Sequence, residues 1–263
     1  MAVRLLVLGG GRMGGALVGG LISSGWAAAE ITVVEPVAAR RAELSAEHPG
    51  LRVVAEAEAA DGAVVAVKPG DVEAACRSIA AVGVTRVLSI AAGVPLARLE
   101  ELLGTGAAVV RAMPNTPALI GAGAAAIAPG RAAGDDDLAW AESILSAVGI
   151  VVRVDERLLD AVTGLSGSGP AYVFLVTEAL VDAGVLNGLP RPVSRDLVVQ
   201  TVLGSARLLA ESGQEAEQLR AAVTSPGGTT AAGVRALEAG AVRSALLEAV
   251  TAATERSREL GRG

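Results

Sequence analysis

A glycine-rich stretch, GGGRMG at residues 9–14, follows a short apolar run and precedes a helical pattern. Gly9, Gly11 and Gly14 have the G-x-G-x-x-G spacing of dinucleotide-binding sites. In such sites the glycines allow a tight turn, close approach of a pyrophosphate and close packing of helix on strand. A glycine-rich packing turn is the alternative. A strand before the motif, a helix after it and a further strand ending at Glu35 favour the dinucleotide site.

The residues after the second predicted strand bear on which dinucleotide is bound. Glu35 can accept a hydrogen bond from the ribose 2′-hydroxyl of NAD, and its charge would repel the 2′-phosphate of NADP. Arg40 and Arg41 follow closely, and either guanidinium could instead clamp that phosphate. The sequence leaves the choice between NAD and NADP open.

A second stretch, VTSPGGTT at residues 223–230, gathers glycines and hydroxyls at the start of a helical pattern. Free backbone N–H groups at a helix start form charge-assisted hydrogen bonds with an anion, and glycines let the anion come close. The stretch therefore predicts a carboxylate-binding loop. A plain Ser/Thr helix cap after a proline turn is the alternative.

Short turns follow three more predicted strands, at Lys68-Pro69, at Gly93 and at Pro114-Asn115. Ligands of open α/β sheets bind at the carboxyl ends of the strands, so we expect these turns to line the cofactor. Lys68 is the only lysine, and a solvated strand-end lysine is its alternative role. The predicted cofactor-binding residues are Gly9, Gly11, Arg12, Met13, Gly14, Glu35, Ala66, Val67, Lys68, Pro69, Ala91, Ala92, Gly93, Pro114 and Asn115.

The pattern of apolar residues divides the chain into two parts. Short Val- and Ile-rich runs alternate with stretches of helical length through the first half, which is typical of a doubly wound α/β fold with a parallel sheet. Later the spacing becomes helical, as in residues 171–185, 195–213 and 244–260. We predict a Rossmann-type dinucleotide-binding domain over 1–157 and an all-α domain over 158–263. The helix at 171–185 is apolar nearly all round, so we expect a second subunit to cover it.

Composition narrows the function. The net charge is −6 and the basic residues form no stripe, which argues against nucleic acid as a partner. Cys76 is the only cysteine and His48 the only histidine, and no metal site is expected. Glycines and prolines interrupt the uncharged runs, so we expect no membrane span and a cytoplasmic protein.

Seven motifs, taken in order, resemble those of the pyrroline-5-carboxylate reductase family. They are GGGRMG, VAVKP, SIAAGV, RAMPNTPALIGAG, GLSGSGPAYVF, DAGVLNGLPR and VTSPGGTTAAG. The resemblance spans nearly the whole chain and implies reduction of 1-pyrroline-5-carboxylate to L-proline with NAD(P)H, the last step of proline biosynthesis. It also implies a helical C-terminal domain that interlocks two subunits, and often a ring of five dimers.

The resemblance implies that the loop at 225–230 holds the substrate. A neutral hydroxyl at Thr230 would suffice as the catalytic group, because an imine that arrives protonated needs hydride delivery and little proton management. The implied substrate-binding residues are Ser225, Gly227, Gly228, Thr229 and Thr230.

Two positions depart from the family's usual pattern, and alternatives stay open. Gly70 stands where relatives often have glutamine, and 214–216 read Gln-Glu-Ala where many have an acidic residue and a proline. The enzymatic alternatives are a reductase of a related cyclic imine and a β-hydroxyacid dehydrogenase. The latter usually needs a lysine in its helical domain, and none follows Lys68. A non-catalytic dinucleotide-binding scaffold is the third alternative.

Overall fold

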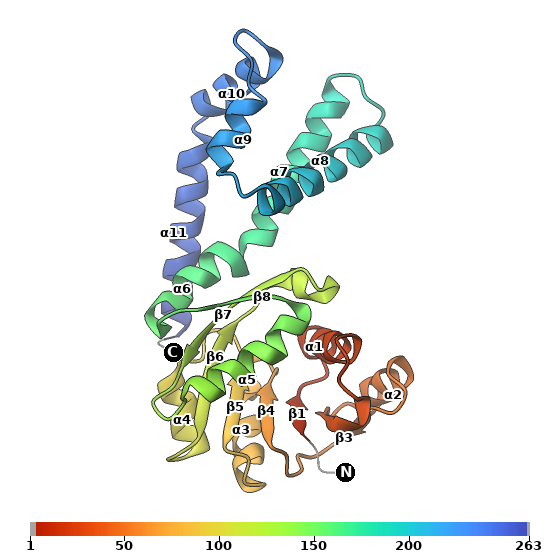
Figure 1. Ribbon diagram of the computed structural model, residues 1–263, viewed down its shortest axis with the longest axis vertical. Coiled ribbons are helices and arrows are strands. Elements are labelled where there is room, and N and C mark those ends of the chain that lie inside the picture. Colours follow the sequence, from red (N-terminus) through yellow and green to blue (C-terminus); the bar gives the residue numbers. More distant parts are fainter. Residues whose placement is uncertain (1–3, 262–263) are drawn as a thin grey trace. The chain divides into compact units, whose positions relative to one another are not determined.

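The computed structural model describes residues 4–261, which form an α/β unit and a helical unit (Figure 1). The α/β unit is built on one eight-stranded sheet with the strand order β3-β2-β1-β4-β5-β6-β7-β8. The strands are β1 (Leu5–Leu8), β2 (Ile31–Val34), β3 (Arg52–Val54), β4 (Gly62–Val65), β5 (Arg86–Ser89), β6 (Ala108–Met113), β7 (Gly123–Pro129) and β8 (Gly149–Arg153). The helices of this unit are α1 (Arg12–Ser23), α2 (Ala38–Glu47), α3 (Val72–Ala81), α4 (Leu96–Leu103), α5 (Asp135–Leu145) and α6 (Leu159–Val162).

Apolar side chains cover both faces of the sheet. In β1, Leu5 and Val7 join a buried cluster with residues of α1, α2 and α5, whereas Leu6 and Leu8 join a second cluster with residues of α3 and α4. Successive side chains of a strand point to opposite faces, so a strand buried on both faces must be apolar at every position. The uninterrupted run LLVL satisfies this requirement, and all four residues are buried.

The strand order contains the switch point of a doubly wound sheet. The strands β1 to β6 are parallel, and β1 lies between β2 and β4. The chain leaves β1 toward β2 on one side and returns to β4 on the other, which opens a crevice at the carboxyl ends of β1 and β4. The predicted fold class is confirmed.

The far edge of the sheet differs from the parallel sheet that the sequence predicts. Strand β7 pairs antiparallel with β6, and β8 pairs parallel with β7. The run that forms β8 was not identified as a strand, because it lies at the sheet edge and most of its residues are partly or fully exposed. Its sequence, GIVVR, has only three consecutive apolar residues and continues directly into a charged segment.

The helical unit comprises Gly169–Val250. Helices α7 and α8 pack on each other, and Val181 and Ser194 are their buried residues. The Ser194 hydroxyl donates a 2.8 Å hydrogen bond to the Val181 carbonyl, and a Cβ on Gly184 would collide with that hydroxyl. Its helices are α7 (Gly169–Leu186), α8 (Arg191–Ser212), α9 (Ala216–Ala222), α10 (Thr229–Ala239) and the greater part of α11 (Val242–Leu260).

The division of the chain in space differs from the predicted boundary at 157/158. The α/β unit extends to Ser168, and it also includes the end of the chain from Thr251. A hydrogen bond of 2.7 Å from the Ser257 hydroxyl to Asp160 Oδ1 ties the last turns of α11 to α6. No periodicity or composition signals a pairing between residues 97 positions apart.

Among residues 4–261, one helical stretch, 156–186, is long and apolar enough to cross a membrane by length and composition alone. Only 6% of its most apolar window is buried within the chain. This single stretch is weak evidence for a membrane, because a helix that packs against a partner subunit has the same composition.

Candidate functional site

The glycine loop lies at the switch point of the sheet. The amide of Gly9 donates to the Val34 carbonyl at 2.9 Å, and the amide of Ala66 donates to the Leu8 carbonyl at 2.8 Å. Gly9 has a φ of +102°, and a Cβ there would lie 2.6 Å from the Ala66 carbonyl oxygen. The ends of β1 and β4 therefore meet at Gly9, and no larger residue fits this turn.

Gly14 is required for the packing of α1. A Cβ at this position would collide with the carbonyl oxygen of Gly9 and would lie 3.3 Å from the Ala66 Cβ. The side chain is therefore excluded by the protein itself, as the third glycine of the fingerprint is in dinucleotide-binding folds.

Gly11 is not explained by the protein's own packing. Its backbone is extended, with φ −67° and ψ −170°, which any residue adopts. A Cβ there would have nothing within 4 Å. The N-terminus of α1, which Gly11 caps, receives no side-chain cap, so its first N–H groups are available to an anion. The space beside these N–H groups is open, and a side chain on Gly11 would occupy it. Such a space fits the pyrophosphate of a dinucleotide.

Arg12 adds a cation to the same helix start. It is exposed, and within residues 4–261 it forms none of the ion pairs of the structure. A cation at a helix N-terminus is unfavourable because the helix dipole already places positive charge there. A bound anion would remove this conflict. Met13 follows in α1 and packs against the core on the side of α1 and α5.

The structure places Glu35 against the glycine loop. The Gly10 amide donates to Glu35 Oε2 at 3.0 Å, and the Val37 amide donates to Glu35 Oε1 at 2.9 Å. The side chain is nearly buried, with 8% exposure for the whole residue. Glu35 thus lies against the glycine loop, and its predicted contact with a cofactor ribose stays a prediction.

The turns after β4 and β5 line a cavity of about 350 Å³ together with residues from the end of the chain. Lys68 is exposed before the turn at 69–71, and Gly93 has a φ of +75°. Sequence reasoning missed part of this cavity wall, because α11 contributes to it from more than 150 residues away. The lining residues are Pro69, Ala92, Gly93, Thr163, Ser168, Ala253, Arg256, Ser257 and Leu260.

The predicted loop after β6 is held by its asparagine. Asn115 Oδ1 accepts from the Ala124 amide at 2.9 Å, and Asn115 Nδ2 donates to the Ser166 carbonyl at 3.1 Å. Pro114, directly before it, is buried. Through these contacts Asn115 positions the loop. Its predicted contact with the cofactor stays a prediction.

The predicted carboxylate loop is a tight turn before α10. The Gly228 amide donates to the Ser225 carbonyl at 3.1 Å, and Gly227 has a φ of +70°, which favours glycine. Gly228 is the N-cap of α10, and no side chain caps this helix start. The alternative of a Ser/Thr cap therefore does not describe the loop, and the first N–H groups of α10 are available to a ligand.

The two threonines that open α10 differ from other threonines in the chain. Within helices, the hydroxyls of Thr163 and Thr177 donate back to the carbonyl four residues earlier, at 2.8 and 2.7 Å. Thr229 and Thr230 occupy the first two helical positions, and between described residues their hydroxyls form no hydrogen bond. A helix start lacks the preceding helical carbonyl that would accept such a bond. Both hydroxyls are therefore available to a ligand.

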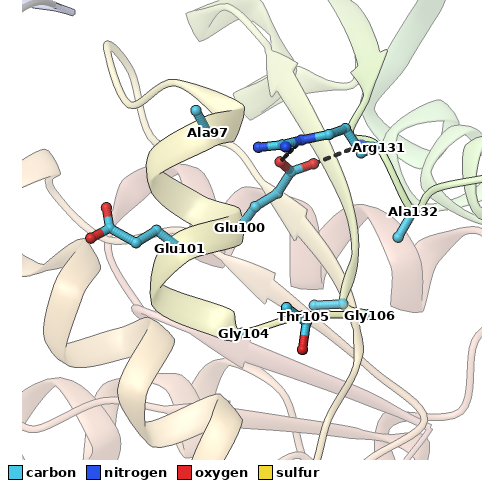
Figure 2. A pocket seen from close by; sticks show the side chains of 9 residues that line it. Ala97, Glu100, Glu101, Gly104, Thr105, Gly106, Arg131 and Ala132 are labelled. Atoms are coloured by element: carbon cyan, nitrogen blue, oxygen red, sulfur yellow. Dashed lines mark hydrogen bonds and ion pairs between the residues drawn. The ribbon is translucent and has the colours of Figure 1, made fainter.

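A separate pocket of about 350 Å³ lies at the opposite end of the parallel strands, lined by residues of α4, by residues just before β6 and by residues just after β7 (Figure 2). There Glu100 accepts from the Arg131 amide at 2.6 Å and pairs with its guanidinium at 3.0 Å. None of the predicted site residues lines this pocket. Open α/β sheets bind ligands at the carboxyl ends of their parallel strands, so this pocket is not part of the candidate site.

The fold and the glycine loop place this chain in the class of Rossmann-type dinucleotide-binding proteins. The family model for pyrroline-5-carboxylate reductase dimerisation matches residues 156–260, and a model described as NADP oxidoreductase, coenzyme F420-dependent, matches residues 4–93. A pyrroline-5-carboxylate reductase from Synechocystis is 48% identical over 269 residues, with 100% of both chains covered. One from Mycobacterium tuberculosis is 42% identical, with 98% of this chain and 96% of the relative covered. The chain belongs to the pyrroline-5-carboxylate reductase family.

Solved structures agree with this assignment. A pyrroline-5-carboxylate reductase from Coxiella burnetii matches with a TM-score of 0.93 and 37% identity, covering 99% of each chain. A pyrroline carboxylate reductase from Plasmodium falciparum, solved with NADP bound, matches with a TM-score of 0.86 and 32% identity, covering 98% of each chain. The predicted family and reaction class, an NAD(P)H-dependent oxidoreductase of proline biosynthesis, are confirmed. The helical domain is a dimerisation domain.

Proposed function

We propose that this chain reduces 1-pyrroline-5-carboxylate to L-proline, with the substrate carboxylate bound by the turn at residues 225–230. The observation that carries this assignment is the uncapped start of α10, where glycines, free N–H groups and two unbonded hydroxyls stand together. An anion bound there receives charge-assisted hydrogen bonds from the backbone N–H groups of Thr229 and Thr230. The α/β unit holds the dinucleotide at Gly9, Gly11 and Gly14.

Different groups of the loop bind the carboxylate and the ring nitrogen of the substrate. When bound, the reduced nicotinamide supplies a hydride to the imine carbon. The backbone amides of α10 fix the carboxylate, which orients the ring and removes the entropic cost of aligning it in the transition state. The Thr230 hydroxyl lies one residue inside the same helix start, where it can hydrogen-bond the ring nitrogen. The absence of a His or Lys at this loop is consistent with a substrate that is already protonated.

Oxidation of NADPH or NADH, with and without 1-pyrroline-5-carboxylate, tests the assignment. We expect cofactor oxidation only with the substrate present and L-proline as the product. Cofactor binding without turnover would support the scaffold alternative. Faster turnover of a six-membered cyclic imine would support the related-imine alternative. The two alternatives therefore give different results in one assay.

The dimerisation domain leads to a prediction about assembly. Along α7 and α8 several large apolar side chains are at least half exposed within one chain, with Phe174 at 63%, Leu175 at 66% and Leu197 at 56%. Burial of such a surface against a second copy gains about 25 cal/mol per Å². We expect Leu175→Glu to yield insoluble or partly unfolded protein, because it places a charge in the interface.

Light scattering of the wild-type protein over a dilution series measures this assembly. An assembly no smaller than a dimer is expected at every concentration at which the protein stays folded. A stable, folded monomer at low concentration would contradict the prediction. We further propose that the dimers associate into a ring of five and that the enzyme is cytoplasmic; the same measurement separates a dimer from a decamer.

A further inference from the structure

Near the carboxyl end of β2 lie the carboxylate of Glu35 and two guanidinium groups that reach back from α2, those of Arg40 and Arg41. In a doubly wound nucleotide-binding fold this position faces the adenosine ribose, where NAD has a hydroxyl and NADP has a phosphate. The three side chains have different partners in the structure, and these partners indicate which of them is available to the ribose. The inference deepens the proposed function, since it rests on a dinucleotide bound at the glycine loop.

The Glu35 carboxylate is hydrogen-bonded to the protein backbone. Each carboxylate oxygen accepts an amide hydrogen bond, from Gly10 on one side and from Val37 on the other, and the residue is 8% exposed. A Cβ on Gly10 would lie 3.3 Å from Glu35 Oε2, so the loop packs directly on the carboxylate. The carboxylate thus orders the glycine loop, and little of its surface is left for a ribose hydroxyl.

Arg40 is hydrogen-bonded to the same loop and paired with acidic neighbours. Its Nε donates to the Gly10 carbonyl at 2.8 Å, so Gly10 is held through its amide by Glu35 and through its carbonyl by Arg40. Its Nη1 pairs with Glu43 at 2.9 Å and with Glu47 at 3.4 Å. The hydrogen bond with Glu43 contributes most to raising the pKa of Arg40. Two carboxylates therefore already offset this charge.

Arg41 is held in place, but its charge is not offset. Its Nη1 donates to the carbonyls of Glu35 and Pro36, at 2.9 and 2.8 Å, which fixes the guanidinium at the end of β2. Across residues 4–261 it forms no ion pair, and its Nε and Nη2 donate to no described residue. A planar guanidinium with donors to spare matches the geometry of a phosphate.

We propose that Arg41 is the residue that determines cofactor specificity, by binding the 2′-phosphate of NADP(H), and that the chain therefore prefers NADP(H) to NAD(H). Glu35 and Arg40 are positioning residues that hold Gly10 and act on both cofactors alike. This assignment selects between two arginines that are adjacent in sequence and differ only in their partners.

Calorimetric titration of the purified wild-type dimer and an Arg41→Gln variant with NADP⁺ and with NAD⁺, in the absence of substrate, tests the proposal. Hydrogen bonds to charged groups contribute enough that Arg41→Gln should weaken NADP⁺ binding about ten- to a hundredfold, with less than about a threefold change for NAD⁺. Adenosine 2′-monophosphate should bind the wild-type protein more tightly than adenosine 5′-monophosphate, and Arg41→Gln should remove this difference. Because no turnover is measured, failure of the reductase assignment would not affect the result.

Arg40→Gln is the matched control, since it removes an equal charge one residue away. It should weaken NADP⁺ and NAD⁺ by similar factors, because it loosens the glycine loop and not the phosphate contact. Glu35→Gln should behave in the same way. Arg41→Lys should retain part of the preference for NADP⁺.

Three results would overturn the proposal. They are equal or tighter binding of NAD⁺ by the wild-type protein, a common loss of both cofactors in Arg41→Gln, and a selective loss of NAD⁺ in Glu35→Gln. The last result would return Glu35 to the ribose hydroxyl. A thermal unfolding curve of each variant shows that the altered binding is measured on folded protein.

Discussion

Gly11→Ala is expected to weaken binding of the dinucleotide about ten- to a hundredfold, the range for overpacking by one methyl group, without lowering the unfolding temperature. The extended backbone of Gly11 suits alanine, and the added Cβ would have no protein atom within 4 Å. Alanine should even favour the folded state slightly, because it restricts the unfolded chain. The methyl group would instead occupy the space into which the pyrophosphate approaches.

Gly14→Ala is the control for this variant. It adds the same methyl group three residues later, where the Cβ would collide with the Gly9 carbonyl oxygen. We expect a lowered unfolding temperature together with loss of cofactor binding. Calorimetric titration with NADP⁺ and a thermal melt separate the two effects. If Gly11→Ala binds NADP⁺ as the wild type does, the pyrophosphate does not approach this residue.

Most of the strands that the sequence predicts correctly are buried on both faces, and the edge strand β3 is the exception. A run such as LLVL in β1 can be nothing but interior, and the fingerprint after it requires a turn, so the core of the fold follows from local pattern. β8 escaped detection because its short apolar run lies at the sheet edge, next to charged residues. The direction of β7 escaped as well, because parallel and antiparallel neighbours present the same apolar residues to the core.

The candidate site divides in a similar way. The glycine loop and the turn before α10 depend on glycines and hydroxyls within a few residues of each other, so spacing alone reveals them. The contribution of Ser257 to the cavity beside Gly93 depends on contacts between distant segments, such as its hydrogen bond to Asp160. The different hydrogen-bond partners of Arg40 and Arg41 are predictable only in part from the sequence. The spacing from Arg40 to Glu43 is that of a helical ion pair, which is a local signal.

Thr230→Ala should lower turnover about ten- to a thousandfold, with little effect on folding, if its hydroxyl assists at the ring nitrogen. The hydroxyl forms no hydrogen bond with the described residues, so its removal breaks no contact that stabilises α10. Thr230→Ser retains the hydroxyl and should recover most of the activity. A merely structural threonine would show neither the loss in the first variant nor the recovery in the second.

Gly228→Val in the same loop should fail differently. Its Cβ would lie 2.5 Å from the Ser225 hydroxyl, and its branched side chain would fill the space before the N–H groups of α10. We therefore expect chiefly a raised KM for 1-pyrroline-5-carboxylate, because the carboxylate loses its place in the ground state and the transition state alike. Steady-state kinetics of both variants at saturating cofactor distinguish the two defects. Full turnover in Thr230→Ala would leave the carboxylate loop intact, and protonation of the nitrogen would then come from water or from the substrate's own iminium.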